Sequence, residues 1–438
     1  MKWNKVKISD FLINRDGRYK PNDKKIKGLK RIDKIDFSGH IYISEKPSKT
    51  DMILIKKGDL VISGINVEKG AMNIYEGDED LTATIHYSSY MIVEEKIDLE
   101  FLKSFLKSPE FKDAIKDQVP GGIKTEIKPK HLLSLEIEIP ESVNDQKSIV
   151  KSLNISNSLI QNLKSETSQQ LELLKKLKQQ ILQDAVQGKL VKQDPKDEPA
   201  SVLLEKIKAE KEKLIKEKKL KPDKPLPPIK EEEIPFQIPD SWEWCRLGDI
   251  CTKITDGFHN TPLKLNKGKI YISATHIKES GINWEECLYI SEKNHNELYS
   301  KAYPKQGEIL IVNRGAGCGI PSIIDIEHEF SFQNCALIGF NQSLINNKYI
   351  YHLIVYMRSI ILLNFVNGGL QPMLSNIILS KMPIPLPSIS EQISIVTKIE
   401  SLMKKCAKLE ESIKQGQKNT EQLMQSVLRD ALKPEGSI

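Results

Sequence analysis

The fold is decided by the stretch Gln180-Ile181-Leu182-Gln183-Asp184-Ala185-Val186, which returns as Ser426-Val427-Leu428-Arg429-Asp430-Ala431-Leu432 at an offset of 246 residues. Upstream, Gln146-Lys147-Ser148-Ile149-Val150 returns as Gln392-Ile393-Ser394-Ile395-Val396 at the same offset. Earlier still, Lys57-Gly58-Asp59-Leu60 matches Gln306-Gly307-Glu308-Ile309 at an offset of 249 residues. Chance does not keep offsets this constant, so the chain contains an internal repeat of roughly 247 residues.

Each copy of the repeat has two unlike parts. The first part carries short apolar runs, such as Asp59–Ile62 and Glu308–Val312, separated by Gly, Pro and Asn turns, a pattern typical of β-strands. A helical pattern follows at 99–116 and 347–366, and a last apolar strand ends at Pro140 or Pro387. We therefore expect an α+β fold class, with two similar α/β domains.

After each of those prolines the apolar residues recur every seven residues, which predicts a long helix of about 44 residues and ~65 Å in each copy. The predicted rows are Leu153, Ile160, Thr167, Leu174 and Ile181 with Ile149, Leu163 and Leu177 in the first helix, and Ile399, Cys406, Ile413, Thr420 and Val427 with Ile395, Leu402, Leu409 and Leu423 in the second. A compact domain cannot bury so long a stripe, so the two helices are expected to pair as a coiled coil. The alternative is that each helix binds another protein.

The repeat predicts five segments: a first domain at 1–143, a long helix at 144–190, a connector at 191–235, a second domain at 236–388 and a second long helix at 389–433. The connector holds a highly charged helical stretch, Ala200–Leu220. A proline-rich run, Lys221–Pro228, follows it and favours extended polyproline geometry. We expect a semi-rigid connector rather than a core element.

The composition excludes some classes of protein. The most apolar stretch, Tyr349–Val366, is interrupted by His352 and Arg358, so no segment reads as a membrane span. Residues Met1–Lys5 lead into no apolar region, which argues against a secretory signal. The six Cys form no C-x-x-C pair, and a reducing cytoplasm is the expected location. The net charge of +6 is compatible with a polyanionic partner without proving one.

Catalytic motifs are missing from the sequence. No G-x-x-x-x-G-K-[ST] phosphate loop occurs. The glycine run Gly315–Gly319 precedes Pro321 and a further strand instead of a helix, so we interpret it as a hairpin loop. Glu217-Lys218-Lys219 matches the E-x-K tripeptide of nucleases, but it lies in the charged connector and lacks the paired Asp on a strand that such a site needs. We therefore expect no catalytic residues, no metal site and no cofactor on this chain.

Polar residues in the loops are suited to reading DNA, because Asn reads adenine, Arg reads guanine and Lys holds phosphates. The candidates are Arg314, Asn313, His259, Asn260, Thr261 and His276 in the second copy, and Arg18, Lys25, Lys27, Arg31, Asn66 and Lys69 in the first. Arg314 is the strongest, since Arg is rare in this chain and this one follows a strand in a Gly-rich loop. The alternatives are solvated loop residues and, for Arg314, a phosphate contact or a pair with Asp325.

Together with the duplication, three strings make the chain resemble the specificity subunit of type I restriction–modification enzymes. They are Pro385–Gln392 entering the second long helix, Gly188–Val191 leaving the first, and Leu226–Gly248 opening the second domain. The first copy departs from the pattern at Glu141–Gln146, which leaves the start of its helix open by a few residues.

The resemblance implies two target-recognition domains that each read half of a split DNA sequence, with the long helices as an antiparallel spacer. It also implies two methyltransferase subunits alongside, motor-nuclease subunits for cleavage, and a role in DNA methylation and phage defence. S-adenosylmethionine, ATP and Mg would be bound by those partners and not by this chain. The rival interpretations are a non-catalytic coiled-coil scaffold that binds other proteins, and a methyltransferase or nuclease with an unrecognised site.

Overall fold

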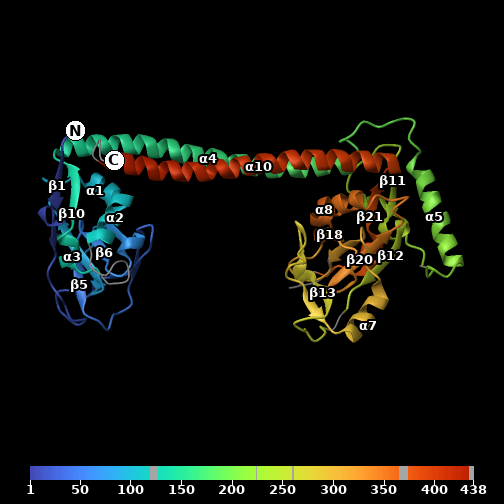
Figure 1. Ribbon diagram of the computed structural model, residues 1–438, viewed down its shortest axis with the longest axis horizontal. Helices are drawn as coiled ribbons and strands as arrows, with labels where there is room; N and C mark the ends of the chain where they lie inside the picture. Colours follow the sequence, from blue (N-terminus) through green and yellow to red (C-terminus); the bar gives the residue numbers. More distant parts are fainter. Residues whose placement is uncertain (119–126, 223, 259–260, 365–372, 434–438) are drawn as a thin grey trace. The chain divides into compact units, whose positions relative to one another are not determined.

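The computed structural model describes residues 1–118, 127–222, 224–258, 261–364 and 373–433 (Figure 1). The chain divides into two units. The first contains residues Met1–Gln170 and Ser412–Ile438, and the second contains Leu171–Glu411. Each unit has one globular domain, called here the first domain (Trp3–Pro140) and the second domain (Glu243–Leu386).

The first domain is built on three antiparallel or mixed sheets. Its two ends pair with each other as β1 (Trp3–Lys7) and β10 (Glu136–Pro140). A four-stranded sheet has the order β2-β9-β6-β7, and a second has the order β4-β3-β8-β5. Their bounds are β2 Leu12–Asn14, β3 Arg31–Ile35, β4 Ile41–Ser44, β5 Met52–Ile55, β6 Leu60–Ser63, β7 Met72–Ile74, β8 Leu81–Thr84 and β9 Tyr87–Ile92.

Helices α1 (Leu99–Leu106), α2 (Pro109–Gln118) and α3 (Pro129–Leu133) complete the core of the first domain. The side chain of Asp98 caps α1 by accepting a hydrogen bond from the backbone N–H of Phe101. Phe101, Phe105 and Phe111 are buried, and Phe105 and Phe111 meet edge to face with ring centroids 5.9 Å apart. The expected helical patch at 99–116 is therefore two short helices packed on the sheets.

The second domain repeats this arrangement. Its ends pair as β11 (Glu243–Arg246) and β21 (Pro383–Leu386), and its main sheet has the order β12-β20-β17-β18. The remaining elements are α6 Leu247–Ile250, β12 Cys251–Asp256, β13 Lys269–Ser273, β14 Ile277–Lys278, β15 Gly281–Ile282, β16 Leu288–Ile290, α7 Glu292–Ala302, β17 Ile309–Val312, β18 Pro321–Ile323, β19 Phe330–Gln333, β20 Cys335–Phe340, α8 Asn347–Asn364 and α9 Asn376–Lys381. The equal strand orders confirm the two similar α/β domains.

More than one element differs between the copies, because the second domain also has a two-stranded sheet, β14-β15, between β13 and β16. The first domain places strand β5 between β4 and β6, where it pairs with β8. The second domain places helix α7 between β16 and β17. The second sheet of that domain is consequently three-stranded, β16-β13-β19.

An equivalent ion pair anchors the main sheet of each domain. In the first, Arg15 donates two hydrogen bonds of 2.6 and 2.7 Å to the buried carboxylate of Asp59. In the second, Lys253 lies 2.9 Å from Glu308 and also donates to two backbone carbonyls. Asp59 and Glu308 occupy matching positions in the repeat because each holds the start of the central strand of its sheet, β6 in the first domain and β17 in the second.

A buried glutamine joins each domain to its long helix. Gln146 accepts a 2.7 Å hydrogen bond from the N–H of Asp98 and donates a 3.0 Å bond to the carbonyl of Pro140. Gln392 makes the same two bonds, at 2.9 Å from the N–H of Asn346 and at 3.1 Å to the carbonyl of Pro387. Both side chains are fully buried. The Gln of the repeated string is thus a structural joint.

The two long helices are α4 (Val143–Val186) and α10 (Ile389–Ala431), and they lie side by side (Figure 1). Within the first unit, Leu153 packs in one cluster with Leu428 and Leu432, while Lys164 reaches Met424. Within the second unit, Lys178 pairs with Glu410 at 2.5 Å. Partner numbers fall along α10 as they rise along α4, so the pairing is antiparallel, as the resemblance implied.

One row of the predicted seam is confirmed, and the other is confirmed only at Ile149 and Ile395, which are buried. Leu153, Ile160, Leu174 and Ile181 are buried on α4, as Ile399, Cys406, Ile413 and Thr420 are on α10. In the second row, Leu163, Leu177, Leu409 and Leu423 are 42–50% exposed. Their places are taken by neighbours one residue further along, such as Lys164 and Lys178, which cover the seam with their aliphatic stems.

The connector is more firmly attached than expected. Helix α5 (Ala200–Lys216) is shorter than the predicted Ala200–Leu220, and it buries Ala200, Leu203 and Ile207. The buried guanidinium of Arg246 donates to the carbonyls of Pro227, Pro228 and Lys381 and to both carboxylate oxygens of Glu233. The end of the proline-rich run is therefore fastened to the second domain through Pro227 and Pro228, while these prolines stay exposed, as expected of a connector that is not a core element.

Candidate nucleic-acid interface

The most basic surface of the first domain is the loop between β2 and β3. Residues 17–31 contain seven cations and a single acid, Asp23. The cations are Arg18, Lys20, Lys24, Lys25, Lys27, Lys30 and Arg31. The loop is fixed by two backbone hydrogen bonds between Tyr19 and Met52, of 2.9 and 2.8 Å, and by the buried side chain of Ile26. A loop that is anchored while six of its seven cations are exposed suits a phosphate backbone.

The candidates of the first domain fall into three groups. Arg18, Lys25 and Lys27 are exposed, and no side-chain bond ties them to another described residue. Arg31 is engaged instead, because it donates to the carbonyl of Lys46 and to Asp33 and so braces the β3–β4 hairpin. Asn66 and Lys69 lie on the turn that follows β6, where Asn66 is half-buried and Lys69 is exposed.

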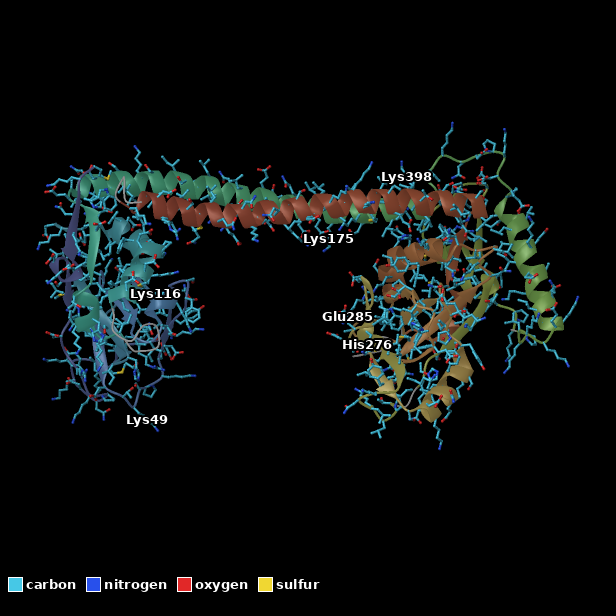
Figure 2. The ribbon with its side chains drawn as sticks, in the orientation of Figure 1. Lys49, Lys116, Lys175, His276, Glu285 and Lys398 are labelled. Atoms are coloured by element: carbon cyan, nitrogen blue, oxygen red, sulfur yellow. The ribbon has the colours of Figure 1, made fainter. Side chains whose placement is uncertain are left out.

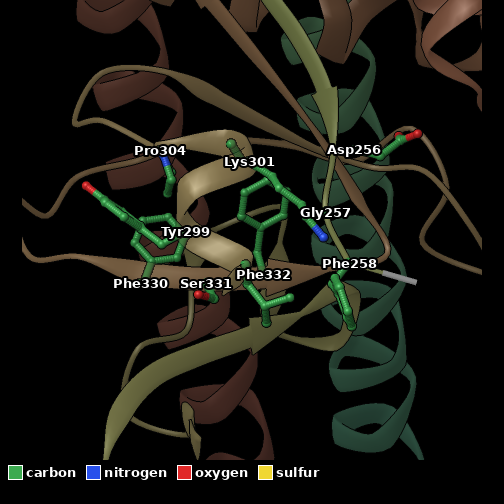
Figure 3. Close-up of a pocket in the computed structure, with 11 residues that line it drawn as sticks. Asp256, Gly257, Phe258, Tyr299, Lys301, Pro304, Phe330, Ser331 and Phe332 are labelled. Atoms are coloured by element: carbon green, nitrogen blue, oxygen red, sulfur yellow. The ribbon is translucent and has the colours of Figure 1, made fainter. Parts of the chain in front are cut away.

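The equivalent loop of the second domain joins β12 to β13. His259 and Asn260 lie outside the described residues. Thr261 is exposed and its hydroxyl hydrogen-bonds to the side-chain amide of Gln333. At the root of the loop, Asp256, Gly257 and Phe258 line a small pocket, and Lys301 of α7 lies 5.1 Å from the centre of the Phe258 ring (Figure 3). Helix α7, which the first domain lacks, thus supports this loop.

Arg314 lies in the turn between β17 and β18. These strands pair antiparallel, which confirms that the glycine run is a hairpin loop. Arg314 is exposed, and its backbone bridges to Met373. Asp325 accepts a 2.7 Å hydrogen bond from Trp284, and among the described residues it forms no ion pair with Arg314. No side chain among the described residues holds its guanidinium.

Asn313 and His276 are placed differently from Arg314. Asn313 is only 6% exposed and donates a 3.0 Å hydrogen bond to Asp256, which ties the ends of β17 and β12 together. His276 is 7% exposed; its Nδ1 accepts from the N–H of Ser273, and its Nε2 lies 2.9 Å from the carbonyl of Glu286. Figure 2 shows His276 and the nearby Glu285 on one side of the second domain. Because both ring nitrogens are engaged, this geometry favours a bracing role for His276.

The other buried histidines of the second domain offer no reactive cluster. Burial lowers the pKa of His352 to about 4, and burial also lowers the pKa of His295, which hydrogen-bonds to Ser331. Among the described residues, no group of three or more His, Cys, Asp or Glu side chains is placed to hold a metal ion. No helix in the described ranges is long and apolar enough to cross a membrane.

Sequence reasoning missed two exposed apolar residues of the first domain, Phe37 and Ile65. The repeat contained a signal for one of them. At the offset of 249 residues, Ile65 occupies the position of Arg314, directly after the equivalent central strand. Phe37 has no such counterpart in the repeat, and its exposure follows only from the fold.

Residues 239–416 match the family model of the type I restriction modification DNA specificity domain. The chain is 33% identical over 268 residues to the EcoAI type I restriction enzyme specificity subunit of Escherichia coli, a match that covers 58% of this chain and 44% of that protein. It is 31% identical to the EcoEI specificity subunit of Escherichia coli, with the same coverage. The match thus spans less than half the length of these curated relatives.

Two solved structures share the fold along the whole chain. One comes from a study of complex assembly and conformational transition in the type I R-M system, with a TM-score of 0.61, 14% identity and coverage of 100% of this chain and 98% of that one. The other is the HsdS subunit from Thermoanaerobacter tengcongensis, with a TM-score of 0.52, 14% identity and coverage of 100% and 97%. The chain is therefore similar to type I specificity subunits in sequence and in fold.

Proposed function

We propose that this chain, which carries a type I restriction–modification DNA specificity domain at 239–416, is the DNA-reading subunit of a type I restriction–modification complex. Each globular domain reads one half of a bipartite target. The observation that carries the proposal is the duplicated strand order, which puts a basic or polar loop at the same place in both domains, at 17–31 and 257–268. Two similar readers on one chain fit a target with two halves.

Phosphate contacts and base contacts are made by different residues. The exposed cations Arg18, Lys25 and Lys27 hold phosphates, which gives affinity that falls with salt and does not depend on sequence. Arg314 reads a base edge, because its guanidinium is exposed on a fixed hairpin and can donate two hydrogen bonds to guanine. Asn313 and Asp256 position that hairpin.

Catalysis belongs to partner subunits in this proposal. Two methyltransferase subunits would bind S-adenosylmethionine and transfer the methyl group, and motor-nuclease subunits would use ATP and Mg. This chain itself is non-catalytic and acts in the cytoplasm. The rival scaffold function has no comparable support, since it leaves the basic loop at 17–31 without a role.

The surface offered to the methyltransferase is the unpaired apolar face of the long helices. On α4, Ile155, Leu159 and Leu163 are spaced four residues apart and are 57%, 59% and 42% exposed. Four-residue spacing puts them on one face. Because the opposite face of α4 already packs against α10, this second apolar stripe is suited to bind a helix of a partner protein.

The test is co-expression with the methyltransferase subunit of the same host, followed by binding to random duplex DNA and mapping of methylated adenines. We expect methylation at a split sequence only when both proteins are present. Binding of the complex to DNA with no sequence preference, or methyl transfer by the isolated chain, would overturn the proposal. Leu159→Glu should abolish co-purification with the methyltransferase, whereas Gln161→Glu, at another exposed position on α4, should not.

A further inference from the structure

Two turns of the first domain hold large apolar side chains out into solvent. Phe37 is 59% exposed at the tip of the β3–β4 hairpin, and Ile65 is 61% exposed in the turn after β6. Exposed apolar residues are common singly, but these two lie on turns that pack against each other.

The two turns interlock through a pair of glycines. A side-chain carbon at Gly70 would lie 2.8 Å from the carbonyl oxygen of Phe37, and one at Gly39 would lie 2.8 Å from the carbonyl oxygen of Met72. Both glycines have left-handed backbones, with φ of +91° and +88°. Asn73 adds a 2.9 Å hydrogen bond to the carbonyl of Gly39. Each turn thus packs directly on the backbone of the other.

The tip that carries Phe37 is further fixed by Asp36. Its carboxylate accepts hydrogen bonds from the N–H and hydroxyl of Ser38, from the N–H of His40 and from the hydroxyl of Tyr42. The hydrogen bond from the Ser38 hydroxyl is the main reason that the pKa of Asp36 falls to about 2. The exposed ring is therefore displayed by a rigid turn, which lowers the entropy cost of using it in binding.

The charges around the ring suit a polyanion. Lys69 lies 5.4 Å from the centre of the Phe37 ring, and Lys34 lies 4.4 Å from the centre of the neighbouring Tyr42 ring. The acids nearby are occupied: Asp36 holds the turn, and Asp33 pairs with Arg31. Apolar groups flanked by cations match the flat faces of nucleobases beside their phosphates.

Position within the repeat supports the same ligand. Ile65 stands where the second domain has Arg314, directly after the equivalent central strand. If Arg314 meets DNA, the corresponding turn of the first domain faces DNA as well. This turn presents an apolar side chain and cannot read the base by hydrogen bonds from that side chain.

We propose that Phe37 and Ile65 form an apolar wedge that unstacks one base step in the half-site of the first domain, with Lys69 on the adjacent phosphate. The inference rests on the proposed function. The exposed area of Phe37 favours a wedge over a simple contact with a thymine methyl group. Phe37 alone leaves about 100 Å² in solvent, taking a Phe side chain as roughly 150–250 Å². A methyl group covers only roughly 30 Å², whereas a base face covers the ring.

The test uses the full chain co-purified with its methyltransferase and duplexes that carry the mapped target with 2-aminopurine at successive positions. Binding should raise the fluorescence severalfold at one step of one half-site. Phe37→Ala and Ile65→Ala should each abolish that rise and weaken specific binding by about tenfold. Phe37→Leu should keep most of it, because Leu is also an effective wedge. Ile13→Ala, which removes a 49% exposed residue on β2, should change neither quantity.

The remaining outcomes separate the inference from the proposed function. Specific binding without a fluorescence rise at any position would overturn the wedge and leave the DNA-reading role intact. A loss of affinity on replacing thymine by deoxyuridine, with no unstacking, would show methyl contact and also overturn it. If Phe37→Ala abolished binding of the methyltransferase and left DNA binding unchanged, the surface formed by Phe37 and Ile65 would be a protein interface, which would also overturn the wedge. Absence of any specific DNA binding by the unmodified complex would instead refute the proposed function.

Discussion

Replacing the buried glutamines one at a time tests the duplicated joint between each domain and its long helix. Gln146→Leu removes both bonds of the first joint and leaves the N–H of Asp98 and the carbonyl of Pro140 buried without partners. An unsatisfied buried polar group costs about 1–3 kcal/mol. Two such groups, offset in part by the added apolar volume of Leu, give an expected loss of about 2–4 kcal/mol in the stability of the first domain. Gln392→Leu should cost the second domain a similar amount.

Hydrogen exchange measured by mass spectrometry assigns the loss to a domain, because each unit opens with its own free energy. Gln146→Leu should accelerate exchange in β1 and β10 by roughly 30- to 1000-fold and leave β11 and β21 unchanged. Gln392→Leu should give the mirror image. The matched controls are Gln→Glu at each position, which keeps the acceptor for the backbone N–H but loses the donor.

The reasoning would fail if either Leu variant cost less than about 0.5 kcal/mol, the level of an ordinary surface substitution. It would also fail if one variant accelerated exchange in both domains equally, because the joints would then not act on separate units. Methylation by the assembled complex should fall at the half-site of the weakened domain first.

Three further outcomes are expected. Arg314→Ala should relax one position of the second half-site at a cost of about 1–3 kcal/mol in binding, scored on a library randomised in both half-sites; an even loss across all sequences would mean a phosphate contact. Arg246 lowers the pKa of Glu233 from 4.5 to about 2, so this pair should stabilise the second domain above pH 4.5 and lose its effect as the pH falls towards 2, a dependence that Glu233→Gln should remove from urea unfolding curves. Gly70→Ala should destabilise the first domain by more than Gly58→Ala, since both have a left-handed backbone but only Gly70 meets a carbonyl, and equal losses in thermal unfolding would contradict this.

The duplication and the long helices could be predicted because their signals are local and repeated. Gln146 and Gln392 recur at a fixed offset, and the core row of the seam keeps a seven-residue period through Leu174 and Ile413. The second row could not be assigned in the same way. Leu163 is a better seam residue than Lys164 by hydrophobicity, and only the packing shows that Lys164 lies over the seam while Leu163 faces outward.

The sequence indicates which residue types could contact DNA, but not whether the fold leaves their hydrogen-bonding groups exposed. His276 has donors and acceptors that look free in the sequence, and the fold engages both nitrogens. Asn313 is likewise tied to Asp256 across two strands that are 53 or more residues apart in the chain. Arg314 remains exposed because it lies two residues beyond the strand end, in the hairpin turn. Long-range pairing, which a single sequence does not reveal, decides these cases.

The core of the first domain has a consequence for the order of synthesis. Leu428 and Leu432, near the end of α10, pack in the same cluster as Leu153 and Ile149. A ribosome adds roughly 5–20 residues per second, so the stretch 171–411 takes about 10–50 s to make after the rest of that unit has emerged. During this interval the cluster of the nascent first domain lacks Leu428 and Leu432, so we expect part of its apolar surface to be exposed. A chaperone that shields apolar surfaces should therefore bind the nascent chain until α10 arrives, and a premature stop before Leu428 should leave the first domain prone to aggregation.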